Sequence, residues 1–526
     1  MRQPVLFLIS FIFLSLLISY NVYNSYQHFG QLVYPLDDAY IHMAISKNLQ
    51  QHGIWGVTRF EFSSTSSSIL YTLVLSFSFA LFGIKAWLPL AINWLAAAAV
   101  IWLVSKISLR FMNAFAAVVA NLLFIALVPL SGMAVLGMEH CLQILFCTWF
   151  TWLSYRKWKG EKVSDAGYAA IAFLAVATRY ESIFLIGLAG ALWLFFYKNW
   201  KQVIMLAIAA ILPICIFGFY AIAQGGYFVP NSLLAKSNYV NEGVGGFITE
   251  AVKKIINNSM LAALIVIPFA YWQLFPLRIR NEFRLRPEHQ VISLVGFTAI
   301  IHQVFASFGW MFRYEAYLIA ILFVACIITW KDWKSLFNDR NTLSKLVVAV
   351  FSFFLLIPLI MRIQIPAFTN RAMKNIHDQH LQMAGFVHDH FPGAGIAMND
   401  IGTTTFFNND MRLFDMEGLG TLEILKMKKQ FDSSFLSQYV SRHRIDIGIF
   451  YPHLYKGKIP STWEQVGSWE IKDRFVAAGS EVGFFAINPA SREKLVKALQ
   501  LYASKLPKDV KQKGVYMQQL PFQSYP

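Results

Sequence analysis

The sequence predicts a polytopic α-helical membrane protein, with about 11 transmembrane helices, followed by a soluble α/β domain. Of the 526 residues, 56% are hydrophobic and only 14% are charged, far from the balance of soluble globular proteins. Long apolar runs recur along the first two thirds of the chain, and Lys and Arg gather in the short segments between them. From about residue 364 these runs stop and charges become frequent, which indicates a change of domain.

The basic balance of the chain does not indicate a nucleic-acid partner. A net charge of +16 would support one only if the basic residues gathered on a soluble face. Here they are spread between apolar runs, which fits loops on the cytoplasmic side of a membrane. No disulfide framework or cysteine-based metal site is expected, because all the cysteines lie inside apolar runs. They are Cys141, Cys147, Cys215 and Cys326.

The first apolar run, 5–22, follows Arg2 and has no small-residue cleavage site after it, so we expect an uncleaved span with its N-terminus inside. The first outer loop then covers residues 23–67. The next run, 69–83, is shorter than the roughly 20 residues of a crossing and is expected to be re-entrant or to lie at the surface. Further spans are expected near 86–104, 111–130, 140–155, 166–178, 183–197, 203–223, 258–274, 290–308, 315–330 and 346–363.

Positive residues between the spans set the predicted sidedness, because Lys and Arg favour cytoplasmic loops. The expected inside groups are Arg156, Lys157, Lys159 and Lys162; Lys198 and Lys201; Arg278, Arg280, Arg284 and Arg286; and Lys331, Lys334, Arg340 and Lys345. The transmembrane domain then covers residues 1–363, and residues 364–526 form an outer α/β domain. Strand-like runs occur in that domain at 395–399 and 447–451, but a glycine-rich nucleotide loop does not.

Two adjacent carboxylates, Asp37 and Asp38, lie in the first outer loop. One acid is enough to cap a helix, so the second is a surplus that could help to hold a metal or accept a proton from a hydroxyl nucleophile. An apolar stripe at helical spacing follows, and it predicts a helix lying flat on the membrane with Asp38 and His42 on its other face. The stripe is Ile41, Ala44, Ile45 and Leu49. The hydroxyl-rich segment 62–68 could cap the next helix or act as a flexible connection.

Other unusual polar residues fall at the outer ends of the predicted spans. They are Glu139, His140, Arg179, Glu181, Asn231, Lys236, His302 and Arg313. Each has a structural alternative. Arg179 and Glu181 could pair with each other, Lys236 could snorkel, and Glu139 could cap its helix. Both histidines could be hydrogen-bonded packing residues. Their presence on one side of the membrane nevertheless suggests a site where a charged lipid head group meets a polar substrate.

Four of these stretches resemble the GT-C glycosyltransferases, and most closely the branch that includes the mycobacterial arabinofuranosyltransferases. They are Leu36-Asp37-Asp38-Ala39-Tyr40-Ile41, Gly137-Met138-Glu139, Thr178-Arg179-Tyr180-Glu181 and the segment from Pro230 to Lys236. The outer domain adds Asn399-Asp400-Ile401-Gly402 and the segment from Phe414 to Leu419. The chain departs from the family where a Thr-Ser-Pro-Leu stretch is usual, having Thr65-Ser66-Ser67-Ser68-Ile69, and where Tyr180 replaces a proline. These departures concern the shape of the acceptor site.

The resemblance implies an inverting transfer of a sugar from a polyprenyl-phosphate donor to an extracytoplasmic glycan or lipid acceptor. It implies that Asp37 is the base, with Asp38 orienting it or sharing a divalent metal ion. Some members bind such an ion and others do not, so the metal stays open. For the donor phosphate the candidates are Arg179, Lys236 and Arg313. The candidate substrate-pocket residues are His42, Glu139, His140, Glu181, Asn231 and His302.

Two other classes compete with a transferase. A transporter or lipid flippase would also have many spans and buried charges, but it usually shows internal repeats, and none relates the two halves of this sequence. A structural or sensory membrane protein would use the outer domain to bind a ligand, and the charged outer residues would only pair with one another. Against this stands the concentration of motifs in the membrane half. The expected location is a bacterial inner membrane, with the active side and the C-terminal domain facing the periplasm or exterior.

Overall fold

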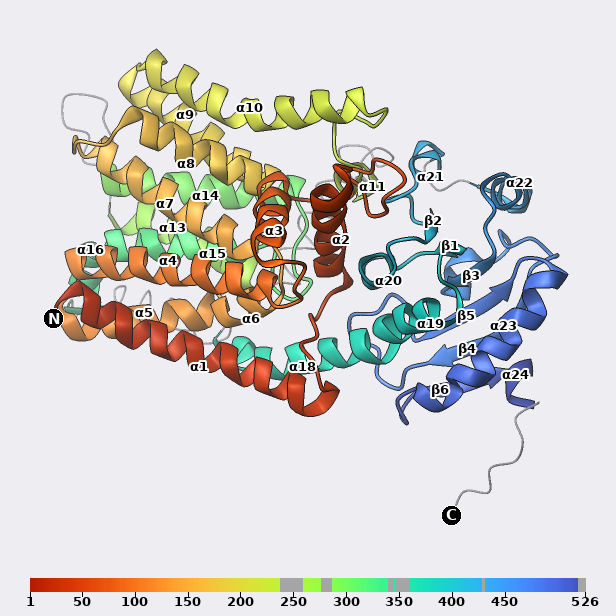
Figure 1. Cartoon of the computed structure of the whole chain (residues 1–526). Helices are drawn as coiled ribbons and strands as arrows, with labels where there is room; N and C mark the ends of the chain where they lie inside the picture. The colour runs from red at the N-terminus through yellow and green to blue at the C-terminus, as the bar shows by residue number, and fades with distance from the viewer. Residues whose placement is uncertain (237–258, 276–285, 339–344, 346–358, 428–430, 519–526) are drawn as a thin grey trace.

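The computed structural model describes residues 1–236, 259–275, 286–338, 345, 359–427 and 431–518. A body of long helices makes up one side of the molecule and a domain with a mixed sheet makes up the other (Figure 1). Four elements lie where the two parts meet: α2 (Asp37–His52), α3 (Ile69–Phe82), α11 (Asn231–Lys236) and α20 (Gly402–Phe407). The N-terminus lies at the far end of the helical body from the sheet.

The helical body has an apolar exterior as well as an apolar core. Leu16, Phe77 and Leu95 are 63%, 65% and 67% exposed, which fits side chains that face lipid. Its other helices are α1 (Gln3–Phe29), α4 (Leu88–Phe111), α5 (Ala114–Leu127), α6 (Leu130–Val135), α7 (His140–Trp158), α8 (Asp165–Thr178), α9 (Ile183–Tyr197), α10 (Trp200–Ala223), α13 (Ser259–Leu274), α14 (Pro287–Phe305), α15 (Ala316–Ile328) and α16 (Trp330–Asn338). A short 3-10 turn, Tyr180–Ser182, joins α8 to α9.

A helix covers each predicted span from 5–22 to 315–330. Within the described residues, four segments are long and apolar enough to cross a membrane: Gln3–Phe29, Leu88–Phe111, Tyr180–Tyr197 and Trp200–Ala223. Most of the predicted span 346–363 lies outside the described residues, so the count of about 11 spans stays a prediction. The short run 69–83 is the 14-residue helix α3, and Ser68 caps it by accepting from the Tyr71 N–H.

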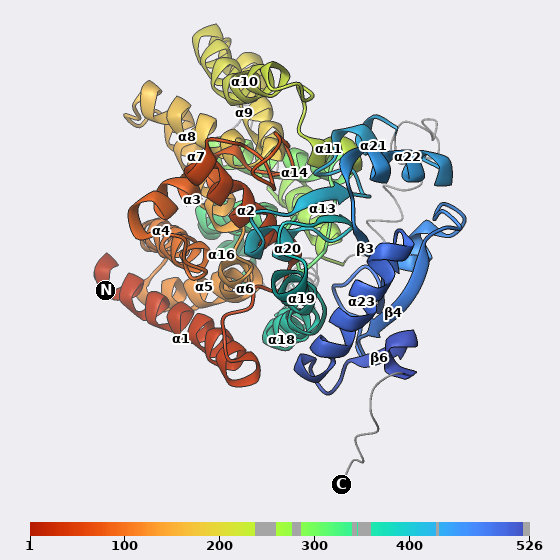
Figure 2. The same ribbon diagram turned by 45° about the vertical axis from the view of Figure 1, so that its right-hand side comes forward.

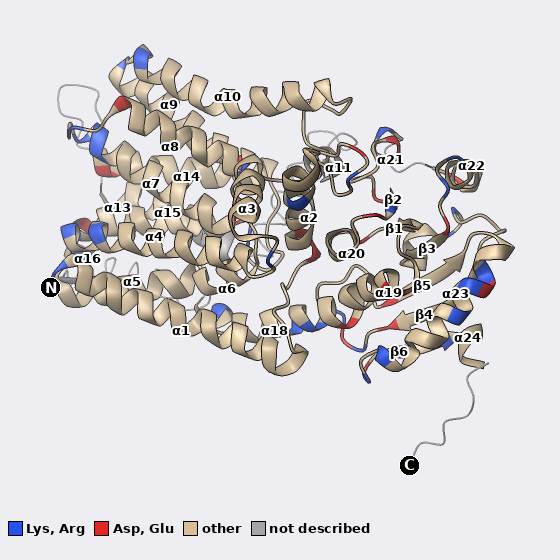
Figure 3. Cartoon of the chain, in the orientation of Figure 1, with Lys and Arg blue, Asp and Glu red and all other residues tan. Residues whose placement is uncertain are grey.

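The basic loops gather at one end of the helical body. Figure 3 shows Lys and Arg at the α7–α8 and α9–α10 connections and at α16, the end that also holds the N-terminus and lies away from the C-terminal domain. This grouping agrees with the predicted sidedness. Several residues of the predicted inside groups lie outside the described part of the chain, namely Arg278, Arg280, Arg284 and Arg340.

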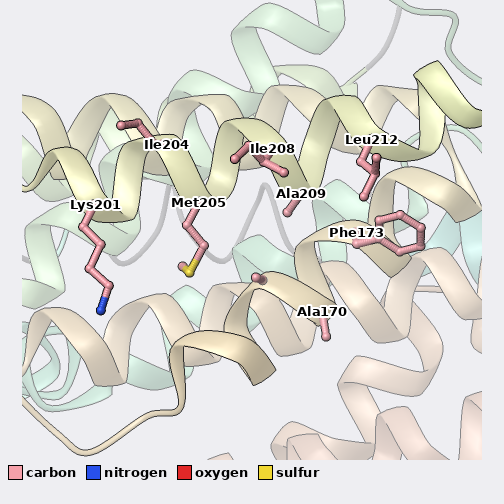
Figure 4. A pocket seen from close by; sticks show the side chains of 9 residues that line it. Ala170, Phe173, Lys201, Ile204, Met205, Ile208, Ala209 and Leu212 are labelled. Atoms are coloured by element: carbon pink, nitrogen blue, oxygen red, sulfur yellow. The ribbon is translucent and has the colours of Figure 1, made fainter.

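An apolar groove runs along the outside of the helical body between α8 and α10, with a volume of about 590 Å³. In Figure 4, Phe173 and Leu212 lie near one end and Lys201 lies at the other. Its lining contains none of the predicted site residues. This groove is separate from the polar site described below.

The C-terminal domain is built on a six-stranded sheet with the strand order β2-β1-β3-β5-β4-β6. Strand β1 pairs in parallel with both β2 and β3, and the remaining neighbours are antiparallel. The strands are β1 (Gly395–Met398), β2 (Arg412–Asp415), β3 (Ile447–Phe450), β4 (Glu464–Glu470), β5 (Glu481–Ala486) and β6 (Lys511–Gly514). The strands predicted at 395–399 and 447–451 are therefore confirmed as β1 and β3.

Helices cover both faces of this sheet. On one face, Phe386 of α19 (Gln382–His390) and Leu499 of α23 (Pro489–Tyr502) join a core with Trp469. On the other face, Tyr439 of α22 (Ser433–His443) stacks on Phe414. Helix α18 (Ile365–Asn375) and a π-helical turn, Ile376–Leu381, lead from the body into α19. The smaller elements are α21 (Leu422–Lys426), α24 (Val515–Gln518) and the 3-10 turns Pro452–Tyr455 and Ala503–Lys505.

The prediction that α2 lies flat on the membrane is wrong. Its apolar stripe is covered by protein, because α2 packs against α3 on one side and α20 on the other (Figure 2). Ile41 and Ile45 belong to the same apolar core as Met383 and Val387 of the C-terminal domain. Amphipathic spacing identifies an apolar face but does not tell whether lipid or another domain covers it. The cysteines are free, as predicted.

Candidate functional site

A small polar cavity lies where the helical body meets the C-terminal domain. Its volume is about 30 Å³, which is enough for water but not for a sugar. It is lined by the first outer loop, the turn before α7, the start of α11 and the C-terminal domain, although these segments are far apart in the sequence. The lining residues are Asp38, Ile41, His42, Thr65, Ser67, Met138, Ser232 and Leu419.

Asp38 contributes a carboxylate to this cavity and pairs with an arginine. Its Oδ2 lies 2.7 Å from Nη2 of Arg313. The Arg313 side chain is only 3% exposed, and it also donates to the Tyr314 hydroxyl over 2.9 Å. The three residues before it, Trp310, Met311 and Phe312, all have left-handed φ values, of 47°, 63° and 61°. Such strain persists where the surroundings impose it and often marks a functional site.

Asp37 points away from Asp38, into the C-terminal domain. Its Oδ2 accepts from the Gly402 N–H over 2.6 Å, and its Oδ1 accepts from the N–H and hydroxyl of Thr403 over 2.8 and 3.0 Å. Oδ1 also lies 3.3 Å from Nδ1 of His380. Burial opposes ionisation of Asp37, but His380 and the two backbone N–H groups hold its pKa below the usual value. Asp37, the first residue of α2, therefore caps α20.

Glu139 is the centre of a buried polar network. Its Oε2 lies 3.1 Å from Nε2 of His42, and its Oε1 accepts from Ser67 over 2.8 Å and from Nη1 of Arg179 over 2.6 Å. Arg179 also pairs with Glu181, over 2.6 Å. Glu139 directly precedes α7 but makes no side-chain cap, so the capping alternative is wrong. The pairing of Arg179 with Glu181 is confirmed, and Glu139 extends it.

The remaining predicted site residues divide into three kinds. Asn231 connects the first outer loop to the C-terminal domain, because its side chain accepts from the Ser64 hydroxyl over 2.9 Å and donates to the Leu419 carbonyl over 3.0 Å. His302 is a hydrogen-bonded packing residue, with Nδ1 2.9 Å from the Tyr317 hydroxyl. His140 is fully buried, and within the described residues neither ring nitrogen has a hydrogen-bond partner, so the hydrogen-bonded alternative is wrong there.

Lys236, the last residue of α11, has a side chain outside the described part of the structure. Its predicted contact with a donor phosphate therefore stays a prediction. The structure also adds site residues that the sequence did not single out: His380, Thr403 and Lys47, all from the contact between α2 and the C-terminal domain. The sequence contains a partial signal for Thr403, because the motif 399–402 leads directly to it.

The two aspartates do not form a shared metal site in this geometry. Asp37 is surrounded by N–H and O–H donors, and Asp38 faces a guanidinium. Across the residues that the structure describes, no group of three or more His, Cys, Asp or Glu side chains is arranged to hold a metal. We therefore derive no chemical step through a metal ion.

Comparisons with known proteins agree with this architecture. Residues 374–485 match a family model described as a domain of unknown function (DUF8728). The comparison with curated proteins gives no match. ArnT from Cupriavidus metallidurans bound to undecaprenyl phosphate is similar in structure, with a TM-score of 0.55 and 13% identity over 91% of this chain and 98% of that one. The same protein in the apo state gives 0.54 and 14%, over 93% and 99%.

A second solved structure, the oligosaccharyltransferase from Archaeoglobus fulgidus in complex with Zn and sulfate, gives a TM-score of 0.51 and 13% identity, over 96% of this chain and 74% of that one. Both neighbours are GT-C glycosyltransferases. The chain has the GT-C fold. It is a membrane protein whose helical body and C-terminal sheet domain together follow that architecture, and the predicted fold class is confirmed.

Proposed function

We propose that this chain is an inverting glycosyltransferase that moves a sugar from a polyprenyl-phosphate donor to an extracytoplasmic glycan or lipid acceptor. The observation that carries the proposal is the Asp38–Arg313 pair beside the polar cavity, within a GT-C fold. The bound undecaprenyl phosphate of the Cupriavidus neighbour supports a lipid-phosphate donor. Helices α2 and α11, which contribute to the cavity lining, are at the end of the helical body away from the basic loops, which fits an active side facing the periplasm of an inner membrane.

The reaction forms a bond between the acceptor oxygen and the anomeric carbon, and it breaks the bond from that carbon to the lipid phosphate oxygen. The proton of the acceptor hydroxyl goes to a carboxylate, and the lipid phosphate leaves. Arg313 can grip phosphate oxygens bidentately, and doing so would release Asp38 from its ion pair. A freed Asp38 at the cavity can then accept the proton.

This assignment differs from the sequence-based one, in which Asp37 is the base. Both Asp37 oxygens already accept hydrogen bonds from the C-terminal domain, and the residue does not line the cavity. We therefore assign the proton transfer to Asp38 and a holding role to Asp37. Arg179 is paired with two carboxylates, so we assign it to the buried network that supports His42 and Ser67 of the cavity, and Lys236 stays a candidate for the donor phosphate.

The proposal leaves two classes of transferred sugar, a pentose and a hexose. The motifs of the membrane half resemble the arabinofuranosyltransferase branch, so we propose that both pentosyl and hexosyl donors be tested. The experiment is transfer of radiolabelled sugar from a panel of polyprenyl-phosphate donors by membranes containing the wild-type chain, Asp37→Asn, Asp38→Asn and Asp410→Asn. Asp410 is the matched control, because it forms a surface pair with Arg59 and is 61% exposed.

We expect turnover with one donor class, unchanged in Asp410→Asn and lowered by about 10²- to 10⁴-fold in Asp38→Asn, the usual contribution of a positioned acid or base. If Asp37→Asn loses turnover and Asp38→Asn does not, the general base is Asp37 and not Asp38. If the folded wild-type chain transfers nothing from any donor, the transferase proposal fails. The transporter alternative would then be tested by flipping of lipid-linked sugar in vesicles.

A further inference from the structure

The carboxyl edge of the parallel strands in the C-terminal domain has the form of a ligand site. Strand β1 lies between β2 and β3, and both pair with it in parallel, so the chain passes from β1 to β2 on one side and then from β2 to β3 on the other side of β1. In open α/β sheets, ligands bind outside the carboxyl ends of the strands at such a switch point. Here Asn399 and Asp400 follow β1 and Tyr451 follows β3, and the Asn399 side chain accepts from the Tyr451 N–H over 3.2 Å.

The start of helix α2 lies at that edge. Asp37 reaches it from the helical body, with its Oδ1 3.3 Å from Nδ1 of His380, and Nε2 of the same ring lies 3.5 Å from Asp400. His380 is 3% exposed and comes from a π-helical turn, a rare irregularity that is frequent at functional sites. The Tyr451 hydroxyl lies 3.5 Å from Nε2 and donates to Gln379 over 2.8 Å.

We propose that the C-terminal domain is a positioning domain of the active site, in which His380, Gly402 and Thr403 hold Asp37 so that Asp38 faces the cavity. Successive residues of a helix point about 100° apart, so anchoring one side chain fixes the direction of the next. The anchored acid meets the domain over 2.6 and 2.8 Å, and its neighbour meets Arg313 over 2.7 Å. Under this inference, residues 374–485, which match the domain of unknown function, position the site carboxylates for the proposed transfer.

A separate contact from the same domain forms part of the cavity wall. The Leu419 carbonyl accepts from the Thr65 hydroxyl over 2.8 Å and from the Asn231 side chain over 3.0 Å. Leu419 itself lines the cavity beside Asp38. The domain thus contributes both a wall of the site and the group that orients its carboxylate, through segments on either side of β2.

The first arm of the test measures thermal unfolding and needs no activity. An asparagine amide at position 380 can reach the place of Nδ1, the atom beside Asp37, whereas a glutamine amide reaches the place of Nε2, beside Asp400. We expect His380→Gln to lower Tm by more than about 2 °C relative to His380→Asn. This difference should disappear when Asp37→Asn is also present, because the partner of Nδ1 is then neutral. His388→Asn, at an exposed position of α19, is the control and should leave Tm unchanged.

The second arm measures transfer and rests on the proposed function. Misplacing a reacting group by about 1 Å can cost about 10²-fold, so we expect His380→Gln to lower kcat by about 10- to 100-fold with little change in the donor KM. His380→Asn should recover most of this loss, and His388→Asn should match the wild type. Recovery by glutamine instead of asparagine would overturn the contact with Asp37.

A pH profile distinguishes positioning from general stability. Burial opposes the charged imidazole, but Asp400 and Asp37 raise the pKa of His380 above its usual value. The groups that face the ring are Asp37, Asp400 and Tyr451. As the pH rises through this pKa, Asp37 loses a cationic neighbour but keeps an N–H donor. Wild-type kcat should therefore fall on the alkaline side only by the small amount that separates it from His380→Asn, and this limb should be absent in His380→Asn.

The two arms separate the two hypotheses. In one outcome, wild-type membranes are inert with every donor, but the Tm difference between His380→Gln and His380→Asn still depends on Asp37. The transferase proposal then fails, and the domain still holds α2. If the Tm effects of substitutions at positions 37 and 380 are independent, the positioning proposal is overturned whether or not transfer is observed. Where transfer is observed, the proposal is also overturned if both His380 variants retain full kcat and the alkaline limb.

Discussion

At the scale of single residues, the site is a set of buried charges that satisfy one another. Glu139, with no exposed side-chain surface, contacts His42, Ser67 and Arg179. Removing one partner of such a network leaves the others in a low dielectric without compensation, which costs more than the intact pair contributes. Glu139 thereby links α2, the serine-rich connection and the end of α8, so that the walls of the cavity keep a fixed geometry.

We predict that Glu139→Gln destabilises the protein by about 3 kcal/mol, the lower end for breaking a buried pair, because Arg179 keeps its second partner, Glu181. The measurement is thermal or denaturant unfolding in detergent. Glu161→Gln is the control, since Glu161 pairs with Arg110 and Arg156 at the opposite, partly exposed end of the helical body. Equal effects of the two substitutions would contradict the role of Glu139.

At the scale of elements, α2 is attached to α20 at two points. The Asp37 carboxylate accepts hydrogen bonds from the N–H groups at the start of α20. Further along α2, the Lys47 ammonium donates to the Phe406 carbonyl near the end of α20. Lys47 is 3% exposed and its ammonium lies 4.9 Å from the centre of the Phe406 ring. An acid at the N-terminal end of a helix and a base at its C-terminal end both match the helix dipole. The six residues of α20 therefore hold α2, the helix that carries Asp38, at two points.

The second attachment predicts a dependence of stability on pH. Burial lowers the pKa of Lys47 to about 8, and the nearby Asp410 offsets only part of this effect. An unfolded lysine titrates near 10.4, so between about pH 8 and pH 10 the unfolded chain binds more protons than the folded chain, and stability rises with pH. The cost of burying the charged lysine, about 3 kcal/mol, is fully present below about pH 8.

We expect Lys47→Met to remove this rise while leaving the protein at least as stable at pH 7, since a buried charge is often replaced by an apolar side chain without loss. Denaturant unfolding of both proteins at several values between about pH 7 and pH 10 gives the comparison. Lys505→Met, at a 58% exposed lysine, is the control and should keep the wild-type slope. A wild-type slope in Lys47→Met would show that Lys47 does not titrate in this range.

The same elements show how far the sequence could lead. Apolar runs, Lys and Arg placement and the composition change near residue 364 predict the helices, their sidedness and the sheet domain, because each follows from local composition. The pair formed by Asp38 and Arg313 joins residues 275 positions apart, counting from 38 to 313, and local patterns do not encode such a contact. For the same reason the stripe with Ile41 and Ile45 predicts a lipid-facing helix, although the C-terminal domain covers it.

At the scale of the whole molecule, the active site depends on how closely the two parts approach. Gly402 is at the closest point: a Cβ there would lie 2.2 Å from the Asp37 carbonyl oxygen and 2.8 Å from its Oδ2. The nearest atom belongs to the backbone, so relief requires α2 and α20 to separate. The motif at 399–402 thus ends in a glycine because the first turn of α2 leaves no room for a side chain.

We predict that Gly402→Ala loosens the contact between the two parts and abolishes transfer. Overpacking typically costs about 1–3 kcal/mol, which should appear as a lower Tm and as faster amide hydrogen exchange in α2 than in the wild type. Exchange in α4 and α7 should not change, because these helices pack within the helical body. Gly187→Ala is the matched control, since a Cβ at that position in α9 meets nothing within 4 Å. Wild-type exchange in α2 together with full activity in Gly402→Ala would mean that the body and the domain do not need this close approach, and the holding role of Asp37 would fall with it.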